Sequence, residues 1–281
     1  MKKTALFLAL VLMLSSVLLS CKDKKRTDKI DDTEENKVVI AENGKCNYKV
    51  IYPDQCAPWE KEVALYIRDT IEYYSGSDVE IATDWVLNKD EIDPNTKEIL
   101  VGNTNRQESQ DVKKAITVAA HDNKIVVRGI TQISMYYAAG IFVSQYIKNS
   151  ENMRVSIPEN LCVEDIVERP DGWALYAMPA MDGVEFGKVL DSSRPKCYKP
   201  DGYSMGNECV RVQNFDNVQQ SQIDKYVEKL ERYGFIVDSR ISYENTQVVS
   251  LYLASAGRQH RYCLTLTGTR LTISQTVPYS N

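Results

Sequence analysis

A short β-branched run that leads almost at once into an amphipathic helix constrains the fold of this chain most. Residues 48–52 are typical of a strand, Pro53 ends the run, and Pro58 is well placed to begin a helix. Apolar residues then recur at nearly every fourth position until Gly76. They are Trp59, Val63, Ile67, Ile71 and Tyr74. Because a helix with one apolar stripe must bury that stripe, the segment predicts a helix packed on a sheet.

The rest of the first half continues this alternation of strands and helices. A hairpin is expected to turn at residues 121–123, and a second helix with Ile133, Tyr137 and Ile141 on one stripe follows it. The expected elements are strands at 79–82, 99–101, 115–120 and 124–128 and a helix at about 131–147. Together they predict a mixed sheet with two helices.

The second half carries one long helix and several strands joined by short turns. The helix is expected at about 219–233, with Gly234 placed to end it. The strands are expected at 173–176, 208–212, 235–243, 247–254, 259–267 and 270–275. The chain is therefore predicted to be α+β with two domains, 41–167 and 170–281, the second an antiparallel sheet with one main helix.

The order of elements in the first half resembles the non-catalytic domain ahead of the barrel in α-glucuronidases and chitobiase-like β-hexosaminidases. The resemblance covers about residues 46–166. The segments that carry it are 48–53, the helix from Pro58, 98–106 with its Gly-Asn-Thr-Asn-Arg turn and Glu108-Ser109 after it, and 124–129. The second half resembles small α+β domains at the ends of uncharacterised bacterial lipoproteins, a likeness that assigns no activity.

The resemblance implies a fold and an association with glycans, and it carries no catalytic residue over. In those enzymes the catalytic carboxylates lie on a (β/α)₈ barrel that follows this domain. Such a barrel needs about 250 residues, and the chain after Asp165 is too short to form one. The chain is therefore expected not to be an enzyme.

The first 20 residues are typical of an export signal, with Lys2 and Lys3 ahead of an apolar run. The four residues 18–21, Leu-Leu-Ser-Cys, resemble the lipobox of bacterial lipoproteins. This resemblance implies cleavage between Ser20 and Cys21 and acylation of Cys21 by chains such as palmitate. An uncleaved signal anchor is the alternative, but the apolar run is shorter than the roughly 18 to 20 residues that span a bilayer.

Residues 21–40 follow the anchor as a stretch that is mostly charged or polar and predicts a disordered tether. Dual or triple acylation holds a protein stably on a bilayer. The predicted location is the extracytoplasmic face of a bacterial cell membrane, with the membrane itself as a partner through the lipid anchor.

Six cysteines remain after Cys21, and an even number in an exported chain permits three disulfides. We favour a bond between Cys197 and Cys209, because they bracket a turn-rich loop, and a bond between Cys46 and Cys56 is the second choice. Reduced, buried cysteines are an equal alternative in a chain of this size. The chain has no Cys-x-x-Cys pair, so no metal site is predicted.

Charge and motifs exclude several functions. The net charge of −5 and the lack of a basic domain argue against nucleic acid as a partner. His121 and His260 are the only histidines, and neither lies in a recognisable catalytic constellation. Phosphate-loop, nucleophile-elbow and zinc-protease motifs are absent from the sequence, and no cofactor is predicted.

Candidate binding residues are found in one polar turn and among the tyrosines. Asn103, Asn105 and Arg106 are grouped in one turn and are candidate ligand contacts, although a turn that satisfies its own backbone uses the same residue types. The chain has 17 tyrosines against 5 phenylalanines, and tyrosine rings can stack on sugars. Four of these tyrosines fall on the two predicted helices, where a core role is the alternative: Tyr73, Tyr74, Tyr136 and Tyr137.

The sequence thus predicts a lipid-anchored, non-catalytic envelope protein that serves as a binding or scaffold module for glycans or surface glycosidases. One alternative is an envelope polysaccharide hydrolase that uses carboxylates without a recognisable motif. Another is a structural subunit that binds a second protein.

Replacing Cys21 with Ser is expected to abolish fatty-acid labelling and retention in the membrane fraction, because the thiol is the acceptor of the lipid. Cys56→Ser is the matched control and should leave both unchanged. Labelling that persists in Cys21→Ser would refute the lipoprotein hypothesis.

Overall fold

The computed structural model describes residues 36–88, 92–165, 175, 178–182, 196–198, 208–257 and 260–278. All of them belong to one compact unit, residues 35–281. The predicted signal peptide, its cleavage site at Ser20 and Cys21, and the tether as far as residue 35 lie outside the described residues. The described part is α+β, as the sequence predicts.

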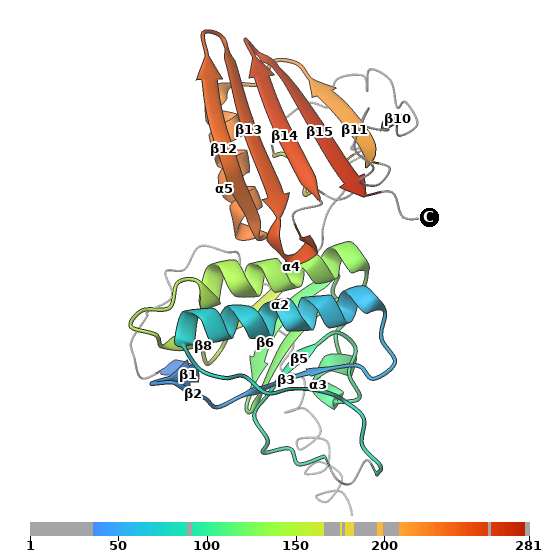
Figure 1. The fold of residues 1–281 in the computed structure, drawn as a ribbon, viewed down its shortest axis with the longest axis vertical. Coiled ribbons are helices and arrows are strands. Elements are labelled where there is room, and N and C mark those ends of the chain that lie inside the picture. Colours follow the sequence, from blue (N-terminus) through green and yellow to red (C-terminus); the bar gives the residue numbers. More distant parts are fainter. Residues whose placement is uncertain are drawn as a thin grey trace, which may run out of the picture. The chain divides into compact units, whose positions relative to one another are not determined.

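A six-stranded mixed sheet is the centre of the first half (Figure 1). Its strand order is β4-β3-β5-β7-β6-β9. Strands β4, β3, β5 and β7 are parallel, and β6 and β9 run antiparallel to their neighbours. The bounds are β3 Lys49–Tyr52, β4 Ile81–Thr83, β5 Glu98–Val101, β6 Ile116–His121, β7 Lys124–Gly129 and β9 Cys162–Asp165.

Two long helices, α2 and α4, cover one face of this sheet (Figure 1). Helix α2, Pro58–Ser75, begins where the Glu60 carboxylate accepts the N–H of Ala57, and it ends at Gly76, whose φ of 65° is left-handed. Helix α4, Gln132–Phe142, is capped by Thr131 and continues as a π-helical turn, Val143–Ile147. Both helices and the hairpin of β6 and β7 confirm the predicted elements, and the short helix α3, Gln107–Gln110, adds to them.

A small three-stranded sheet was not expected from the sequence. It has the order β2-β1-β8, with β1 Lys37–Glu42, β2 Lys45–Cys46 and β8 Val155–Pro158. The predicted tether ends at residue 40, and this boundary is corrected by β1, in which Ile40 and Ala41 are buried. The folded part begins earlier because two apolar residues at the end of the charged stretch find a partner strand far along the chain.

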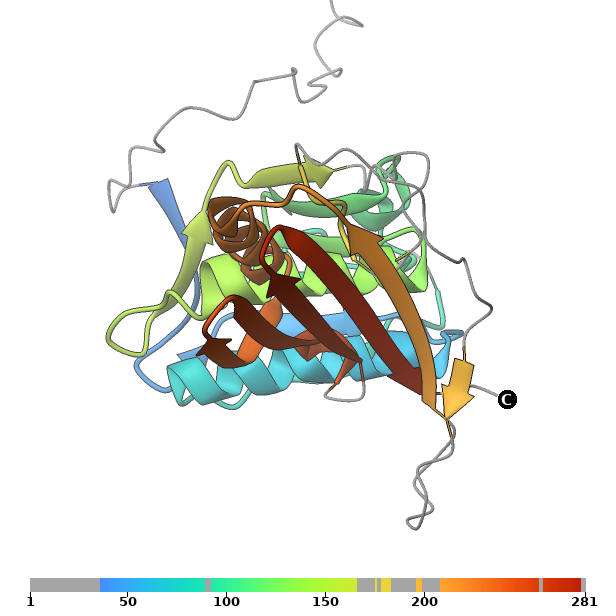
Figure 2. The ribbon, with the colours of Figure 1, turned by 90° about the horizontal axis from the view of Figure 1, so that it is seen from above.

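The second half is an antiparallel sheet with one main helix, as predicted. Its order is β10-β11-β15-β14-β13-β12, and Figure 2 shows helix α5, Gln220–Arg232, along one side of it. The bounds are β10 Lys196–Tyr198, β11 Glu208–Phe215, β12 Phe235–Tyr243, β13 Thr246–Leu253, β14 Arg261–Thr267 and β15 Arg270–Pro278, with a 3₁₀ turn, η4, at Ala254–Ala256. The strand expected at 173–176 falls almost entirely outside the described residues.

The two halves meet at a backbone-to-backbone contact. A Cβ atom added at Gly140 in α4 would lie 2.2 Å from the Tyr233 carbonyl oxygen, and one added at Gly234 would lie 2.4 Å from the Gly140 Cα. Beside it, the Ser255 hydroxyl donates to the Tyr136 carbonyl at 2.7 Å. One hydrophobic cluster contains buried residues of both halves. The predicted domain boundary near residue 170 lies outside the described residues, and the division into two domains stays a prediction.

The second of the two expected disulfides, Cys46–Cys56, is not formed. Cys46, Cys56 and Cys263 have free thiols, so the Cys46–Cys56 bond is wrong, and Cys162 is in a disulfide. Cys197 and Cys209 are Cα partners across β10 and β11. Their side chains lie outside the description, so the bond between them stays a prediction.

The glycine contact predicts an unequal response to alanine at two left-handed glycines. Gly234→Ala should lower the free energy of unfolding by about 3 kcal/mol or more, because the methyl group meets the α4 backbone and φ is strained. Gly268 also has a positive φ but nothing within 4 Å of its Cβ position, so Gly268→Ala should cost about 1 kcal/mol. Urea unfolding of both variants measures the difference, and equal losses would contradict the close contact.

Candidate functional site

The loops after three neighbouring parallel strands meet at one end of the mixed sheet. The chain leaves β3 through α2 to form β4 on one side, and then forms β5 on the other side of β3. In open α/β sheets such a reversal leaves a crevice at the carboxyl ends of the strands, where ligands bind. A groove of about 370 Å³ lies there. We call it the strand-end groove, and it is lined by Pro53, Asp54, Gln55, Asp84, Trp85, Val86, Asn103, Thr104, Asn105 and Gln110.

Asp84, directly after β4, ties the three loops together. Its Oδ1 accepts the backbone N–H of Asp54 at 2.8 Å, and its Oδ2 accepts that of Asn105 at 2.7 Å. The Asn105 side-chain amide donates to the Asp84 carbonyl at 2.6 Å. Because this carboxylate is nearly buried and both oxygens hold backbone amides, Asp84 shapes the groove and offers little to a ligand.

The exposed side chains of the groove combine one aromatic ring with several hydrogen-bonding groups. The Trp85 side chain is 65% exposed, an unusual state for the largest apolar residue. Asp54, Gln55 and Asn103 are exposed beside it. An indole face next to a carboxylate and amides can hold a flat ligand that is apolar on its face and carries hydroxyl groups at its edge.

A buried ion cluster holds the turn at residues 102–106. The Arg106 guanidinium donates to both Glu98 oxygens, at 3.0 Å and 2.9 Å, and the Lys124 ammonium lies 3.2 Å from Oε2. All three side chains are nearly inaccessible to solvent. Burial alone raises the pKa of Glu98, but the hydrogen bonds and charge of Arg106, together with Lys124, outweigh it and hold that pKa below its ordinary value.

The three candidate contacts from the sequence have different positions. Asn103 is exposed in the groove and remains a candidate contact. Asn105 lines the groove, but its amide is occupied by Asp84. Arg106 was expected to contact a ligand, and the structure instead buries it against Glu98. Sequence reasoning missed Trp85, although a tryptophan two residues beyond a β-branched strand was a readable signal.

The other residues considered from the sequence lie away from the groove. His121 is exposed at the end of β6, and His260 packs edge-on against Tyr136, with its pKa lowered by burial. Tyr136 and Tyr137 are buried in α4, in line with a core role.

No protein-family model matches this sequence, and a search of curated proteins finds no match either. Within the described part of the chain, no helix combines the length and apolar character needed to cross a membrane. The described residues also hold no group of three or more His, Cys, Asp or Glu side chains that could share a metal ion.

Removing the Glu98 charge should destabilise the chain in a pH-dependent way. Glu98→Gln should cost about 3 kcal/mol or more at pH 7, since it leaves Arg106 and Lys124 buried without a carboxylate. Folding lowers the pKa of Glu98, so the Glu98 carboxylate stabilises the folded state at pH values above its ordinary pKa of 4.5. This stabilisation is lost as the pH falls below 4.5 and the carboxylate becomes protonated. The difference between the variant and the original chain should therefore shrink toward pH 3.

Urea unfolding at pH 7 and pH 3 measures this change, with the exposed Glu80→Gln as control. A stability difference that does not change with pH would contradict the role of the Glu98 charge.

Proposed function

We propose that this chain is a non-catalytic carbohydrate-binding protein, anchored by lipid at Cys21 to the extracytoplasmic face of a bacterial membrane, and that it binds glycan in the strand-end groove. The observation that supports binding most is the exposed Trp85 ring among polar side chains at the reversal point of the sheet.

The chemistry of the groove suits a sugar better than other small ligands. A sugar ring has an apolar C–H face that can stack on the indole, and hydroxyl groups at its edge that can bond Asp54, Gln55 and Asn103. A phosphate ligand would call for cationic groups, and the described lining residues include no lysine, arginine or histidine. The groove is also largely open to solvent, which suits a ligand that is part of a longer polymer.

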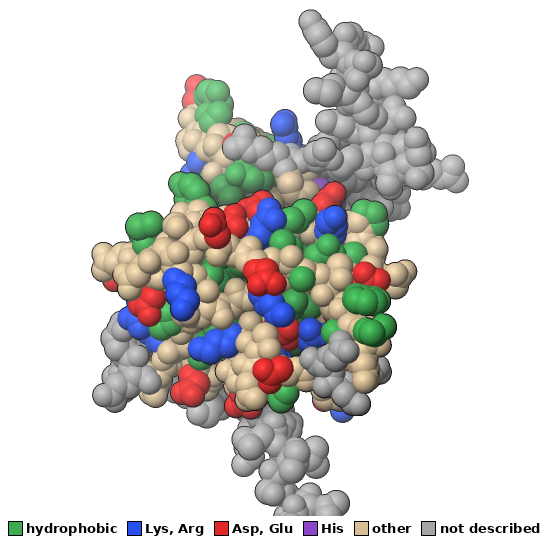
Figure 3. Space-filling view, turned by 60° about the horizontal axis from the view of Figure 1, so that its bottom comes forward, with side chains coloured by type: hydrophobic (Ala, Val, Ile, Leu, Met, Phe, Trp, Pro, Cys, Tyr) green, Lys and Arg blue, Asp and Glu red, His purple; other side chains and the backbone are tan. Residues whose placement is uncertain are grey.

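The surface charge agrees with a neutral or mixed ligand. Figure 3 shows acidic and basic side chains interspersed on the face that it presents. Binding to nucleic acid usually requires a continuous basic stripe. The resemblance of residues 46–166 to a glycosidase accessory domain supports the same proposal by analogy.

The hydrolase alternative has one observation in its favour, because two carboxylates, Asp54 and Asp84, line the same groove. Glycoside hydrolysis needs two carboxyl groups that both reach the substrate. Both Asp84 oxygens already accept backbone N–H groups. Among the described lining residues, Asp54 is then the one carboxylate left to act on a substrate. This arrangement favours binding without turnover.

Trp85→Ala should raise the Kd for a glycan identified on an array by about tenfold, because the stacking surface is lost. Trp85→Phe should restore part of the affinity. Tyr243→Ala removes an equally exposed ring at the end of β12, outside the groove, and should leave the Kd unchanged. Isothermal titration of the three variants measures these changes.

Two outcomes would overturn the proposal. If no glycan on a broad array binds, or if Trp85→Ala binds as well as the original chain, the groove is not the site. Turnover of aryl glucuronides or aryl N-acetylhexosaminides that is lost in Asp54→Asn would establish the hydrolase instead.

A further inference from the structure

A second aromatic site lies between α2 and the antiparallel sheet, apart from the strand-end groove. A cleft of about 370 Å³ there contains four tyrosines, and we call it the tyrosine cleft. Its lining residues are Tyr66, Asp69, Thr70, Tyr73 and Tyr74 of α2, Lys148, and Ile236, Tyr252, Ala254 and Gly257 of the second half. It shares no lining residue with the strand-end groove.

One ring of the cleft, Tyr73, is more exposed than a packing role requires, whereas Tyr66 and Tyr74 are partly buried against the core. Tyr73 is 81% exposed and meets Tyr74 edge to face, with 5.0 Å between ring centroids. Burial raises the pKa of Tyr66, and nearby Tyr252 and Tyr74 raise it further, so the phenol groups are gathered closely. A core would bury such rings, whereas a binding surface leaves one of them available for stacking.

Lys148 brings a positive charge to the same cleft. It directly follows the π-helical turn, and its backbone N–H donates to the Val143 carbonyl at 2.9 Å. Burial lowers the pKa of Lys148. Among the residues that the structure describes, none forms an ion pair or hydrogen bond with its ammonium group. The carboxylate that also lines the cleft, Asp69, is paired with Arg68, whose Nε donates to Asp69 Oδ1 at 2.7 Å. Because a half-buried cation without a partner is unfavourable, an anionic ligand would stabilise Lys148.

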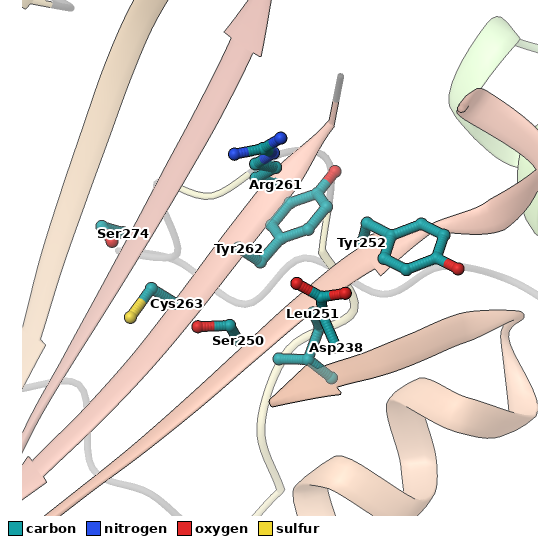
Figure 4. Close-up of a pocket in the computed structure, with 8 residues that line it drawn as sticks. All are labelled: Asp238, Ser250, Leu251, Tyr252, Arg261, Tyr262, Cys263 and Ser274. Carbon is teal, nitrogen blue, oxygen red and sulfur yellow. The ribbon is translucent and has the colours of Figure 1, made fainter. Parts of the chain in front are cut away.

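One lining residue of the cleft, Tyr252, also faces a second space on the antiparallel sheet. This space is a hollow of about 280 Å³, the sheet-face hollow (Figure 4). Its floor is a row of small polar side chains, Ser250, Cys263 and Ser274, which are Cα partners across β13, β14 and β15. Their small size beside larger neighbours leaves the hollow open.

Two charged residues flank this row. Asp238 lies at the bulge of β12, and Arg261 lies beside Tyr262 on β14 (Figure 4). Bulges commonly redirect a side chain toward a site. The serine hydroxyls of the hollow can donate hydrogen bonds to the hydroxyl groups of a ligand and accept them, and the Asp238 carboxylate can accept them.

We propose that the tyrosine cleft and the sheet-face hollow form one site for an acidic oligosaccharide. Sugar rings stack on Tyr73 and Tyr252, an acid group of the ligand pairs with Lys148, and further sugar units lie along the Ser250 row. A chain-like ligand is favoured because the two spaces adjoin at Tyr252, and a peptide is disfavoured because the floor offers no deep apolar pocket for side chains.

The test compares binding of a galacturonic acid oligomer with binding of its carboxyl-reduced, neutral counterpart, by titration calorimetry on the purified full chain. Tyr73→Ala should weaken binding of both oligomers by about tenfold. Lys148→Met keeps the aliphatic stem and should weaken only the acidic oligomer, about tenfold or more. Ser250→Trp fills the hollow and should weaken long oligomers more than a disaccharide.

Matched controls separate this site from the strand-end groove and from unfolding. Tyr243→Ala, Lys113→Met and Trp85→Ala should leave binding of the acidic oligomer unchanged. Thermal unfolding of Tyr73→Ala and Lys148→Met should match the original chain, because neither residue is in the core.

Three results would overturn the inference. The first is no binding of the acidic oligomer, and the second is equal binding of the two oligomers. The third is binding of the acidic oligomer that is weakened by Trp85→Ala but not by Tyr73→Ala. The last result would leave the proposed carbohydrate-binding function intact and remove only the second site.

Discussion

The close approach of Gly140 and Gly234 determines how the described fold holds together. Any side chain at either position would collide with the backbone of the other segment, so helix α4 and the end of helix α5 can meet only through glycine. Tyr137 then packs edge-on against Tyr233, with 5.2 Å between ring centroids, and both halves contribute to one hydrophobic cluster. The tyrosine cleft depends on the same contact, since one of its walls is α2 and the other is formed by β12 and β13.

The strand-end groove depends on a different principle, the parallel pairing of β4, β3 and β5. Parallel strands bring the loops at their carboxyl ends together although these loops are distant in sequence. Buried polar groups then fix the loops: Asp84 binds two backbone amides, and Glu98 holds Arg106. Because these groups are occupied by the protein itself, Trp85 and its exposed neighbours remain available for a ligand.

Much of the fold was predictable from local patterns. The four-residue apolar spacing gave α2 and its end at Gly76, and the alternation around residues 121–123 gave the β6–β7 hairpin. The sheet formed by β1, β2 and β8 was not predictable, because it pairs segments far apart in sequence and β1 adjoins a highly charged stretch. The sequence indicated that the 102–106 turn belongs to the candidate site, but it did not indicate which of the turn's side chains is exposed to a ligand and which is buried. Whether Arg106 meets a ligand or Glu98 depends on the ion cluster, and the importance of Trp85 depends on the order of the strands.

The most direct test of the central claim is an NMR titration of the chain with a glycan selected on an array. We predict that the indole N–H signal of Trp85 and the backbone amide signals of Asn103 and Asn105 shift together and saturate with one Kd. Saturable binding that leaves these three signals unchanged would contradict the assignment of the groove as a carbohydrate site.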